Sequence, residues 1–417
     1  MSLADMLHAL NIAMGILLTL LYGYQLVYLF LPLFCKPKTG SQGKQLHYAI
    51  LIAARNEEKV LPYLLQSIRA QNYPEHLLSI FVVADNCTDK TALAASSNGA
   101  TVFCRNNPAR AGKGYALHFL LHQIQQATGL DRYDCFLIFD ADNLLEPDFI
   151  HHINKIATAG YDVFCGLRNS KNFSGSGISA GHGLWFLHDS VHLNASRMVL
   201  GLPCVVTGTG FGFRRQVLET AGGWNFFTLT EDIEFSTWCI LQGLRCGFSP
   251  DAKFYDEQPT TISQSWRQRT RWVQGGIQVS LRYGPALLRG MLRGGRQGFA
   301  CMEALSLSLW GYSLGALGGI LGLLSSYAAS GLQGVAVCLL LALSYAWLSS
   351  WFMGLMTLLY SWEQIRAGFW YKLFSLFAFP FFMLTYIPIA ISALFRKFHW
   401  PPIEHTAACS LEECRQK

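Results

Sequence analysis

The apolar residues of this 417-residue chain are gathered into a few long stretches without charge. Residues 7–34 contain no Asp, Glu, Lys or Arg, and they exceed the roughly 20 apolar residues that a helix needs to cross a bilayer. This stretch is too long for the core of a secretory leader, and no small-residue cleavage site follows it. Three similar stretches lie at about 304–327, 335–360 and 373–395. Between the two groups, residues 45–275 contain no spanning segment and are numerous enough for one sizeable core.

We therefore predict a multi-pass protein of the cell membrane with one large domain outside the bilayer. Lys36, Lys38 and Lys44 follow the first apolar stretch, whereas only Asp5 precedes it. Because basic residues favour the cytoplasmic side, the N-terminus is expected outside and the large domain in the cytoplasm. The expected parts are a transmembrane helix (1–35), the cytoplasmic domain (45–275), an amphipathic interfacial region (276–300), a transmembrane region of two or three spans (301–396) and a tail with a basic start (397–417).

The path of the last apolar stretch stays open at this level. The uncharged connector 328–334 fits an outside turn, and the charged connector 361–371 fits the inside. A further span would put the tail outside, yet residues 396–397 are Arg-Lys, which favours the inside. Pro380 and Pro388 make this stretch a candidate for a broken helix. A re-entrant or interfacial path for one segment therefore also fits the sequence.

Composition narrows the class of protein further. Only 14% of the residues are charged and 51% are hydrophobic, whereas a soluble domain is about 25% charged. This excludes a disordered chain, a coiled coil and a protein that coats nucleic acid, and the mild net charge of +6 favours membrane lipids as partners. The twelve cysteines are scattered without a CxxC pair, which argues against zinc-ribbon and thioredoxin sites and favours a reducing compartment.

The large domain shows strands alternating with helices. Such alternation predicts an α/β domain with a parallel sheet covered by helices on both faces. In such sheets, ligands bind beyond the carboxyl ends of the strands. The expected strands are the apolar runs 47–54, 78–84, 101–104, 135–139 and 162–167, and the expected helices include 60–71 and 113–126.

Polar residues follow three of these strands. They are Arg55 and Glu57 after the first, Asp85 after the second, and the pair Asp140 and Asp142 after the fourth. Two carboxylates about 4 Å apart repel by about 4 kcal/mol at an effective dielectric of about 20. A Mg²⁺ or Mn²⁺ ion, which commonly shares carboxylate oxygens with substrate phosphates, would remove that cost. The alternative interpretation is a solvated turn.

Two later motifs are also candidates. Thr230-Glu231-Asp232 follows glycine-rich segments at 207–210 and 222–223, and it fits either an acidic site or a helix N-terminus favoured by the helix dipole. The segment 266–272 mixes three arginines with two tryptophans. It fits either a membrane-interface belt or a clamp in which Arg holds a diphosphate and Trp faces a sugar ring.

Two further patterns have structural interpretations. Arg282, Arg289, Arg293 and Arg296 are spaced to share one face of an amphipathic helix on the inner leaflet. His188 and His192, with His182 nearby, have a spacing that can hold a metal, but packing or acceptor contacts are the favoured interpretation.

In combination and in this order, the motifs resemble those of the membrane-embedded, inverting glycosyltransferases of family 2. Relatives of that family include the synthases of cellulose, chitin, hyaluronan and poly-N-acetylglucosamine. The resemblance covers about residues 45–275 and the flanking membrane helices. It implies a GT-A (Rossmann-like) fold, a UDP-sugar donor and a Mg²⁺ or Mn²⁺ cofactor. The motifs that carry it are Ala54-Arg55-Asn56-Glu57, Asp85, Asp140-Ala141-Asp142, Thr230-Glu231-Asp232 and Gln268-Arg269-Thr270-Arg271-Trp272.

The resemblance also implies roles for individual residues. The donor would be bound by Ala54, Arg55, Glu57, Asp85, Lys113 and Asp140, and the metal by Asp142 with Asp140 beside it. The catalytic group would be Asp232 as general base with Glu231, and Gln268, Arg271 and Trp272 as the clamp on the diphosphate and the acceptor end. Asp85 is followed by Asn86-Cys87, where many processive synthases have Asp-Gly.

Two activities fit the resemblance. The first is a transferase that adds glucose or N-acetylglucosamine units to a growing polysaccharide and moves the product across the membrane. The second is a single transfer to a lipid acceptor, as in ceramide glucosyltransferases. An inert nucleotide-sugar-like domain on a channel or sensor is a third class, against which the intact Asp142, Asp232 and Arg271 argue.

Overall fold

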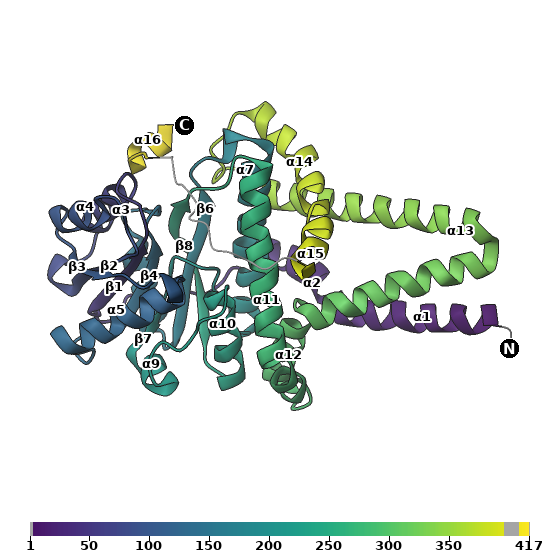
Figure 1. The fold of residues 1–417 in the computed structure, drawn as a ribbon, viewed down its shortest axis with the longest axis horizontal. Coiled ribbons are helices and arrows are strands. Elements are labelled where there is room, and N and C mark those ends of the chain that lie inside the picture. Colours follow the sequence, from purple (N-terminus) through teal and green to yellow (C-terminus); the bar gives the residue numbers. More distant parts are fainter. Residues whose placement is uncertain (1–2, 396–407, 417) are drawn as a thin grey trace.

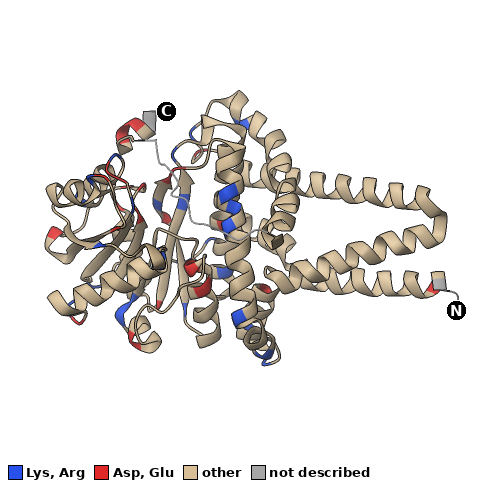
Figure 2. Cartoon of the chain, viewed as in Figure 1, with Lys and Arg blue, Asp and Glu red and all other residues tan. Residues whose placement is uncertain are grey.

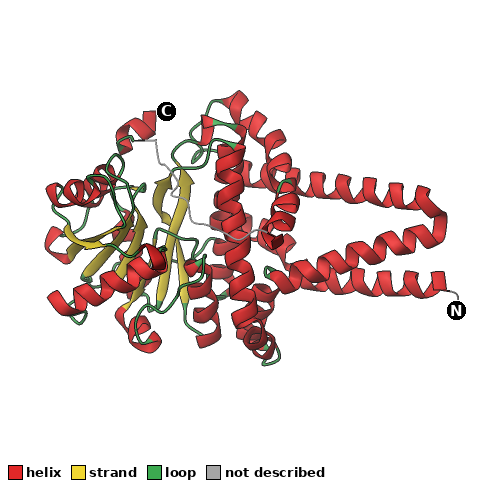
Figure 3. Ribbon diagram, in the orientation of Figure 1, coloured by secondary structure: helices red, strands yellow, loops and turns green. Residues whose placement is uncertain are grey.

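The computed structural model describes residues 3–395 and 408–416 and shows an α/β domain beside a set of long helices (Figure 1, Figure 3). One eight-stranded sheet, in the order β3-β2-β1-β4-β7-β6-β8-β5, forms the centre of the α/β domain. The strands are β1 Tyr48–Ala54, β2 Leu78–Asp85, β3 Thr101–Arg105, β4 Cys135–Asp140, β5 Leu144–Leu145, β6 Val163–Ser170, β7 Phe211–Arg214 and β8 Cys246–Asp256. All five predicted strands are therefore confirmed, and β5, β7 and β8 are additional.

The half of the sheet formed by β3, β2, β1 and β4 is parallel, as predicted. β1 is buried along almost its whole length because helices pack on the sheet, and this explains its continuous apolar sequence. In register, Ala54 pairs with Ala84, so the residues that follow β1 and β2 leave the sheet at the same edge. The covering helices are α3 Leu61–Arg69, α4 Thr91–Ser97 and α5 Lys113–Ala127.

The other half of the sheet corrects the prediction of an all-parallel sheet. β7 runs antiparallel to both β4 and β6, and β5 runs antiparallel to β8. β7 has only four residues and arises from the end of the glycine-rich segment, so it shows too little periodicity to be recognised. The helices of this half are α6 Phe149–Thr158, α7 Gly177–His188, α8 Ala195–Leu200, α9 Arg215–Ala221 and α10 Glu231–Gln242.

The long apolar helices extend away from the sheet (Figure 1). α1 Leu3–Tyr22 continues into α2 Tyr24–Phe34, and α13 Leu309–Tyr360 doubles back on itself. The backbone of α13 is non-helical at Ser330 and Gly331, within the predicted connector 328–334. Three helical stretches in the described chain are long and apolar enough to cross a membrane: 4–34, 309–360 and 369–395.

The last apolar stretch takes a different direction from the α13 hairpin. α14 Phe369–Leu384 and α15 Tyr386–Phe395 lie across the base of the hairpin, where they pack on α7 and on α11 Ile262–Met291 (Figure 1). One face of this pair is buried, while side chains such as Trp370 and Phe377 are exposed. The predicted break is present, since the two helices are separate at Thr385.

The final described segment returns to the sheet. α16 Leu411–Gln416 and the preceding Cys409 pack against Leu144 and Tyr255 at the sheet edge. The basic residues at 396–397 lie outside the described residues.

The prediction of a single arginine-bearing helical face is wrong. Arg282 and Arg289 lie on α11, whereas Arg296 lies on α12 Gly295–Ser306. Gly294 and Gly295 both have positive φ, at 70° and 64°, a conformation that glycine adopts without steric cost. The chain turns there, so the four arginines do not share one helical face.

Candidate active site

The loops after β1 and β2 form one end of the site. Asn56 and Asn86 both have positive φ, at 59° and 52°, which asparagine tolerates better than most residues. The side chain of Asn56 accepts a hydrogen bond from Thr88 N at 2.8 Å, so the two loops are tied together. Arg55 is half-buried, and its Nε has no hydrogen-bond partner among the described residues. An unpartnered guanidinium donor in the loop after β1 suits an anionic ligand.

Asp85 ends β2 and is buried. Its Oδ1 accepts hydrogen bonds from Arg105 Nη1 at 2.5 Å and from Asn86 Nδ2 at 3.0 Å. Arg105 follows as the last residue of β3, which pairs with β2. The ion pair fixes the carboxylate at the strand end, beside the loop that carries Glu57.

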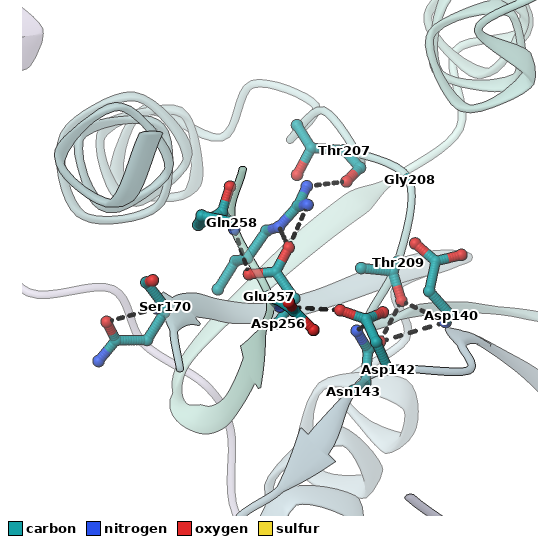
Figure 4. A network of polar contacts seen from close by, with 12 residues as sticks. Asp140, Asp142, Asn143, Ser170, Thr207, Gly208, Thr209, Asp256, Glu257 and Gln258 are labelled. Atoms are coloured by element: carbon teal, nitrogen blue, oxygen red, sulfur yellow. Dashed lines mark hydrogen bonds and ion pairs between the residues drawn. The ribbon is translucent and has the colours of Figure 1, made fainter. Parts of the chain in front are cut away.

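Asp140 and Asp142 lie where β4 leaves the sheet, and Figure 4 shows them in one polar network. Asp140 forms an ion pair with Lys113 at the start of α5. Its backbone N donates to Thr209 Oγ1 at 2.8 Å. Asp142 is buried and accepts a hydrogen bond from Glu257 N at 2.8 Å. Residues from three separate parts of the sequence therefore hold the two aspartates in place.

The glycine-rich segment brings the acidic motif of α10 to the same place. Lys113 Nζ donates to Gly208 O at 2.6 Å, so the lysine bridges Asp140 and this segment. A side chain at Gly208 would begin 3.5 Å from Asp232 Oδ2. Gly208 has a φ of 86°, which strongly favours glycine. Gly208 is therefore close both to Asp232 and to the Lys113–Asp140 pair.

Burial raises the pKa of the acidic pair on α10. Loss of solvation, followed by repulsion from Asp232, raises the pKa of Glu231 to about 7, against the lowering effect of Lys113 and Arg271. Loss of solvation also raises the pKa of Asp232. A carboxylate with a raised pKa is a better proton acceptor near neutral pH.

α11 carries the last motif and closes the site from the membrane side. A side chain at Gly275 would begin 2.7 Å from Thr230 N, so the helix lies directly on the acidic motif. One turn earlier, Arg271 Nη1 donates to Leu229 O at 3.2 Å. Trp272 packs edge-on against His182 and Phe186. Gln268 is half-buried, and its Oε1 has no partner among the described residues.

The donor set of the two aspartates fits a hard divalent cation. Among the described residues, no group of three or more His, Cys, Asp or Glu side chains could hold a metal by itself. Mg²⁺ and Mn²⁺ are commonly bound by one or two carboxylates, with waters and substrate phosphates completing the shell. Asp140 and Asp142 match that pattern, whereas His188 Nδ1 contacts Thr357 Oγ1 and His192 is fully buried beside it.

Several site residues have no local sequence signal. Thr209 lies in the glycine-rich segment 207–210, whereas Asp256 and Arg168, which belong to the same network around the aspartates, are part of no recognisable motif. Arg269 lies within the predicted clamp, yet its guanidinium is fully buried between the rings of Phe382 and Tyr386. The one available signal is position, since Arg168 and Asp256 both lie near the carboxyl ends of strands.

The chain belongs to family 2 of the glycosyltransferases. The model of the "Glycosyltransferase like family 2" matches residues 45–275, the span that contains every motif described above. The domain has the GT-A fold of this class. A solved mannosyltransferase from Pyrobaculum calidifontis, in complex with GDP-Man and Mn²⁺, aligns with a TM-score of 0.54 over 93% of this chain and 99% of that one, at 18% identity.

Two relatives act on different acceptors by name. A beta-monoglucosyldiacylglycerol synthase from Nostoc sp. is 30% identical over 265 residues, covering 60% of this chain and 53% of its own. A poly-beta-1,6-N-acetyl-D-glucosamine synthase from Staphylococcus aureus is 26% identical over 242 residues, covering 56% and 55%. The chain therefore spans about half the length of the curated relatives it matches.

Proposed function

We propose that this protein transfers a sugar from a UDP-sugar to an acceptor hydroxyl at the cytoplasmic face of the membrane, with inversion at the anomeric carbon. One observation carries the proposal. At the carboxyl edge of the sheet, Lys113 pairs with Asp140 and donates to Gly208 O, and the carboxylate of Asp232 lies near Gly208. A donor-binding carboxylate and a candidate base are thereby held within one site.

The residues have distinct proposed tasks. Ala54, Arg55, Glu57 and Asp85 bind the nucleotide, and Lys113 with Arg271 faces the negative charge that develops on the departing diphosphate. Asp232 accepts the proton of the acceptor hydroxyl, which is a poor nucleophile while it remains protonated. A single displacement with one base inverts the anomeric carbon, so no second carboxylate has to act as a nucleophile.

The metal would be held by Asp142, with Asp140 beside it. When bound, Mg²⁺ or Mn²⁺ would supply positive charge that stabilises the leaving diphosphate. Glu257 N donates to Asp142 Oδ2, which orients the carboxylate toward the site.

We infer that the α/β domain is cytoplasmic and that α14 and α15 lie in the inner leaflet. The tip of the α13 hairpin and the start of α1 both lie far from the sheet (Figure 1). Charged residues are sparse on α1 and α13, whereas basic residues occur along α11 (Figure 2). Because α16 packs on the sheet edge, α16 and the connector before α14 are on the same side. This arrangement supports a tail on the inside and an interfacial path for the last apolar stretch.

Reporter fusions test this orientation. Green fluorescent protein fused after Lys417 should fluoresce, and alkaline phosphatase at the same position should be inactive. A Gly331→Cys variant should react with a membrane-impermeant maleimide in intact cells, using the parent protein as the control for its native cysteines. An active phosphatase fusion at the C-terminus would contradict the interfacial path.

A lipid acceptor is favoured over a polymer by the packing of the spanning helices. In the most apolar window of α13, no residue is buried inside the protein, so this part of the hairpin is available to lipid. An acceptor that stays in the leaflet, such as diacylglycerol, needs no path across the membrane. The polymer alternative is favoured by Trp272, whose flat face suits the end of a glycan.

A donor panel with product sizing decides between the two. The purified protein in lipid nanodiscs receives UDP-glucose or UDP-N-acetylglucosamine with Mn²⁺, and UDP release is measured. We expect one glycolipid containing one added sugar when diacylglycerol is present. Formation of a long polymer would show that the acceptor is a growing polysaccharide and not a lipid. The absence of UDP release with every donor would contradict the proposed function.

A further inference from the structure

Arg168, on β6, forms hydrogen bonds with two segments that are distant in the sequence, the end of β8 and the glycine-rich segment 207–210. Its Nε donates to Asp256 Oδ2 at 2.8 Å, and its Nη2 forms an ion pair with the same carboxylate. Its Nη1 donates to Thr207 O at 2.7 Å. All three guanidinium nitrogens of Arg168 therefore form hydrogen bonds. Two bind Asp256 at the end of β8, and one binds Thr207 in the glycine-rich segment (Asp256 and Thr207 are labelled in Figure 4).

Each of these segments holds one of the metal-binding aspartates. The backbone N of Glu257, directly after Asp256, donates to Asp142. Thr209, two residues after Thr207, accepts from the backbone N of Asp140. Figure 4 shows both contacts in one network. A shift of either segment would therefore move one of the two aspartates, Asp140 or Asp142, relative to the other.

The same segments also reach the candidate base. Gly208 lies between Thr207 and Thr209, beside Asp232 Oδ2. The opposite face of the Arg168 guanidinium lies 3.6 Å from the centre of the Phe186 ring. Phe186 in turn packs against Trp272 at 5.8 Å. Arg168 thus lies between the donor side of the site and the aromatic side.

We propose that Arg168 is a positioning residue that fixes the spacing between the metal-binding aspartates and the base Asp232. This inference rests on the proposed function and adds a residue to it. The arginine side chain is only 12% exposed, and its planar fork holds two partners in one fixed geometry, which a lysine cannot reproduce. A misplacement of about 1 Å in such a site can cost about 10²-fold in rate.

Arg168→Lys and Arg168→Met separate positioning from charge. Lysine keeps the positive charge but cannot hold Asp256 and Thr207 together. We expect Arg168→Lys to raise the Mn²⁺ concentration for half-maximal binding by about tenfold, since residues that orient metal ligands typically contribute 10–100-fold. The readouts are electron paramagnetic resonance of free Mn²⁺ and UDP binding with and without Mn²⁺. The transfer kcat should fall about tenfold in Arg168→Lys and about 10²-fold in Arg168→Met.

The direction in which Mn²⁺ affinity changes decides whether Arg168 acts by positioning or only through its charge. If the guanidinium acted only through its charge, Arg168→Lys would bind Mn²⁺ as the parent does, and Arg168→Met would bind it more tightly because a positive charge near two aspartates is lost. Either result would overturn the proposal. Arg197→Lys is the matched control, because Arg197 forms a buried ion pair with Glu303 away from the site. It should leave Mn²⁺ binding unchanged.

The failure of this inference is distinguishable from failure of the proposed function. A parent protein that neither binds UDP with Mn²⁺ nor transfers sugar would overturn the proposed function. Unchanged Mn²⁺ binding and unchanged kcat in a folded Arg168→Lys variant, beside an active parent, would overturn the role of Arg168 alone.

Discussion

Two halves of one sheet, β3-β2-β1-β4 and β7-β6-β8-β5, carry different parts of the proposed reaction. The first half is parallel, and its candidate donor residues directly follow its strands. The second half is mixed in direction and has a register shift between Gly166 and Leu167. Its candidate residues lie on loops and on helices that also contact the membrane elements.

The two halves place their site residues in different ways: by the end of a strand in the first half, and by contacts between distant segments in the second. In the first half, a strand end is enough to place a residue such as Asp85. In the second half, Asp232 reaches the site because Gly208 and Gly275 allow close approach of two other segments. We therefore expect substitutions in the donor half to remove all turnover and those in the acceptor half to separate transfer from donor binding.

The largest effect is expected for Asp142→Asn in the donor half. Because the variant loses the negative charge of a carboxylate proposed to bind the metal, UDP release should fall by at least about 10³-fold. Excess chelator should have the same effect on the parent. Thermal unfolding should change little, since asparagine has nearly the same shape. Asp134→Asn is the matched control at the start of the same strand, and it should keep parental activity. Full activity of Asp142→Asn would remove the metal assignment.

Asp232→Asn tests the acceptor half. The transfer rate should fall by about 10²–10⁴-fold, because general base catalysis contributes that much. Donor affinity, measured by titration with UDP-sugar, should remain nearly parental. If donor affinity collapses instead, Asp232 belongs to the nucleotide side and the division between the halves is wrong.

The pH dependence of transfer sharpens the assignment of the acidic pair. Burial raises the pKa of Glu231 to about 7 and also raises the pKa of Asp232, so the base loses its proton at a higher pH than an ordinary aspartate does. The transfer rate should therefore fall by up to about tenfold per pH unit below the raised pKa of Asp232. A raised carboxyl pKa stabilises the fold at low pH and loses that effect as pH rises.

Glu231→Gln is the control variant for this pH dependence. Its stability relative to the parent should increase from pH 5 to pH 8, measured by thermal unfolding, because the parent alone loses stability over that range. An acid limb of the rate profile that stays near pH 4 would contradict the raised pKa values.

Trp272 should affect the acceptor more than the donor. Trp272→Ala should reduce transfer by about tenfold while changing donor hydrolysis much less, since loss of an aromatic face costs about 1 kcal/mol or more. Trp272→Phe should be milder because a flat ring remains. The ratio of transferred to hydrolysed sugar is the measurement. An equal loss of both reactions would show that Trp272 supports the whole site.

The smallest effect is expected at the membrane surface. Arg289→Glu and Arg296→Glu should weaken binding to anionic lipid by about 1 kcal/mol for each basic residue removed. Synthesis in anionic nanodiscs should fall, while donor affinity and activity in neutral detergent should not change. Arg132→Glu is the control, because Arg132 is an exposed residue in the loop before the central strand β4. Equal effects in neutral and anionic lipid would contradict the electrostatic explanation.

The sequence by itself determines the donor half and the membrane anchor. Continuous apolar runs predict buried parallel strands, and a polar residue directly after such a run must lie at one edge, as Asp85 and Asp140 do. The connector 328–334 likewise predicts the bend at Ser330 and Gly331. These features depend on neighbours in the chain, so local patterns contain them.

Only the tertiary structure decides the antiparallel β7, the break in the arginine face and the partners of Arg168. Arg168 is 39 residues from Thr207 and 88 from Asp256, and no periodicity links positions so far apart. Likewise, the direction of α14 and α15 depends on packing against α7 and α11, since length and hydropathy alone also fit a span. Contacts between distant segments and close approaches at glycines follow from the packed fold, which a local pattern does not encode.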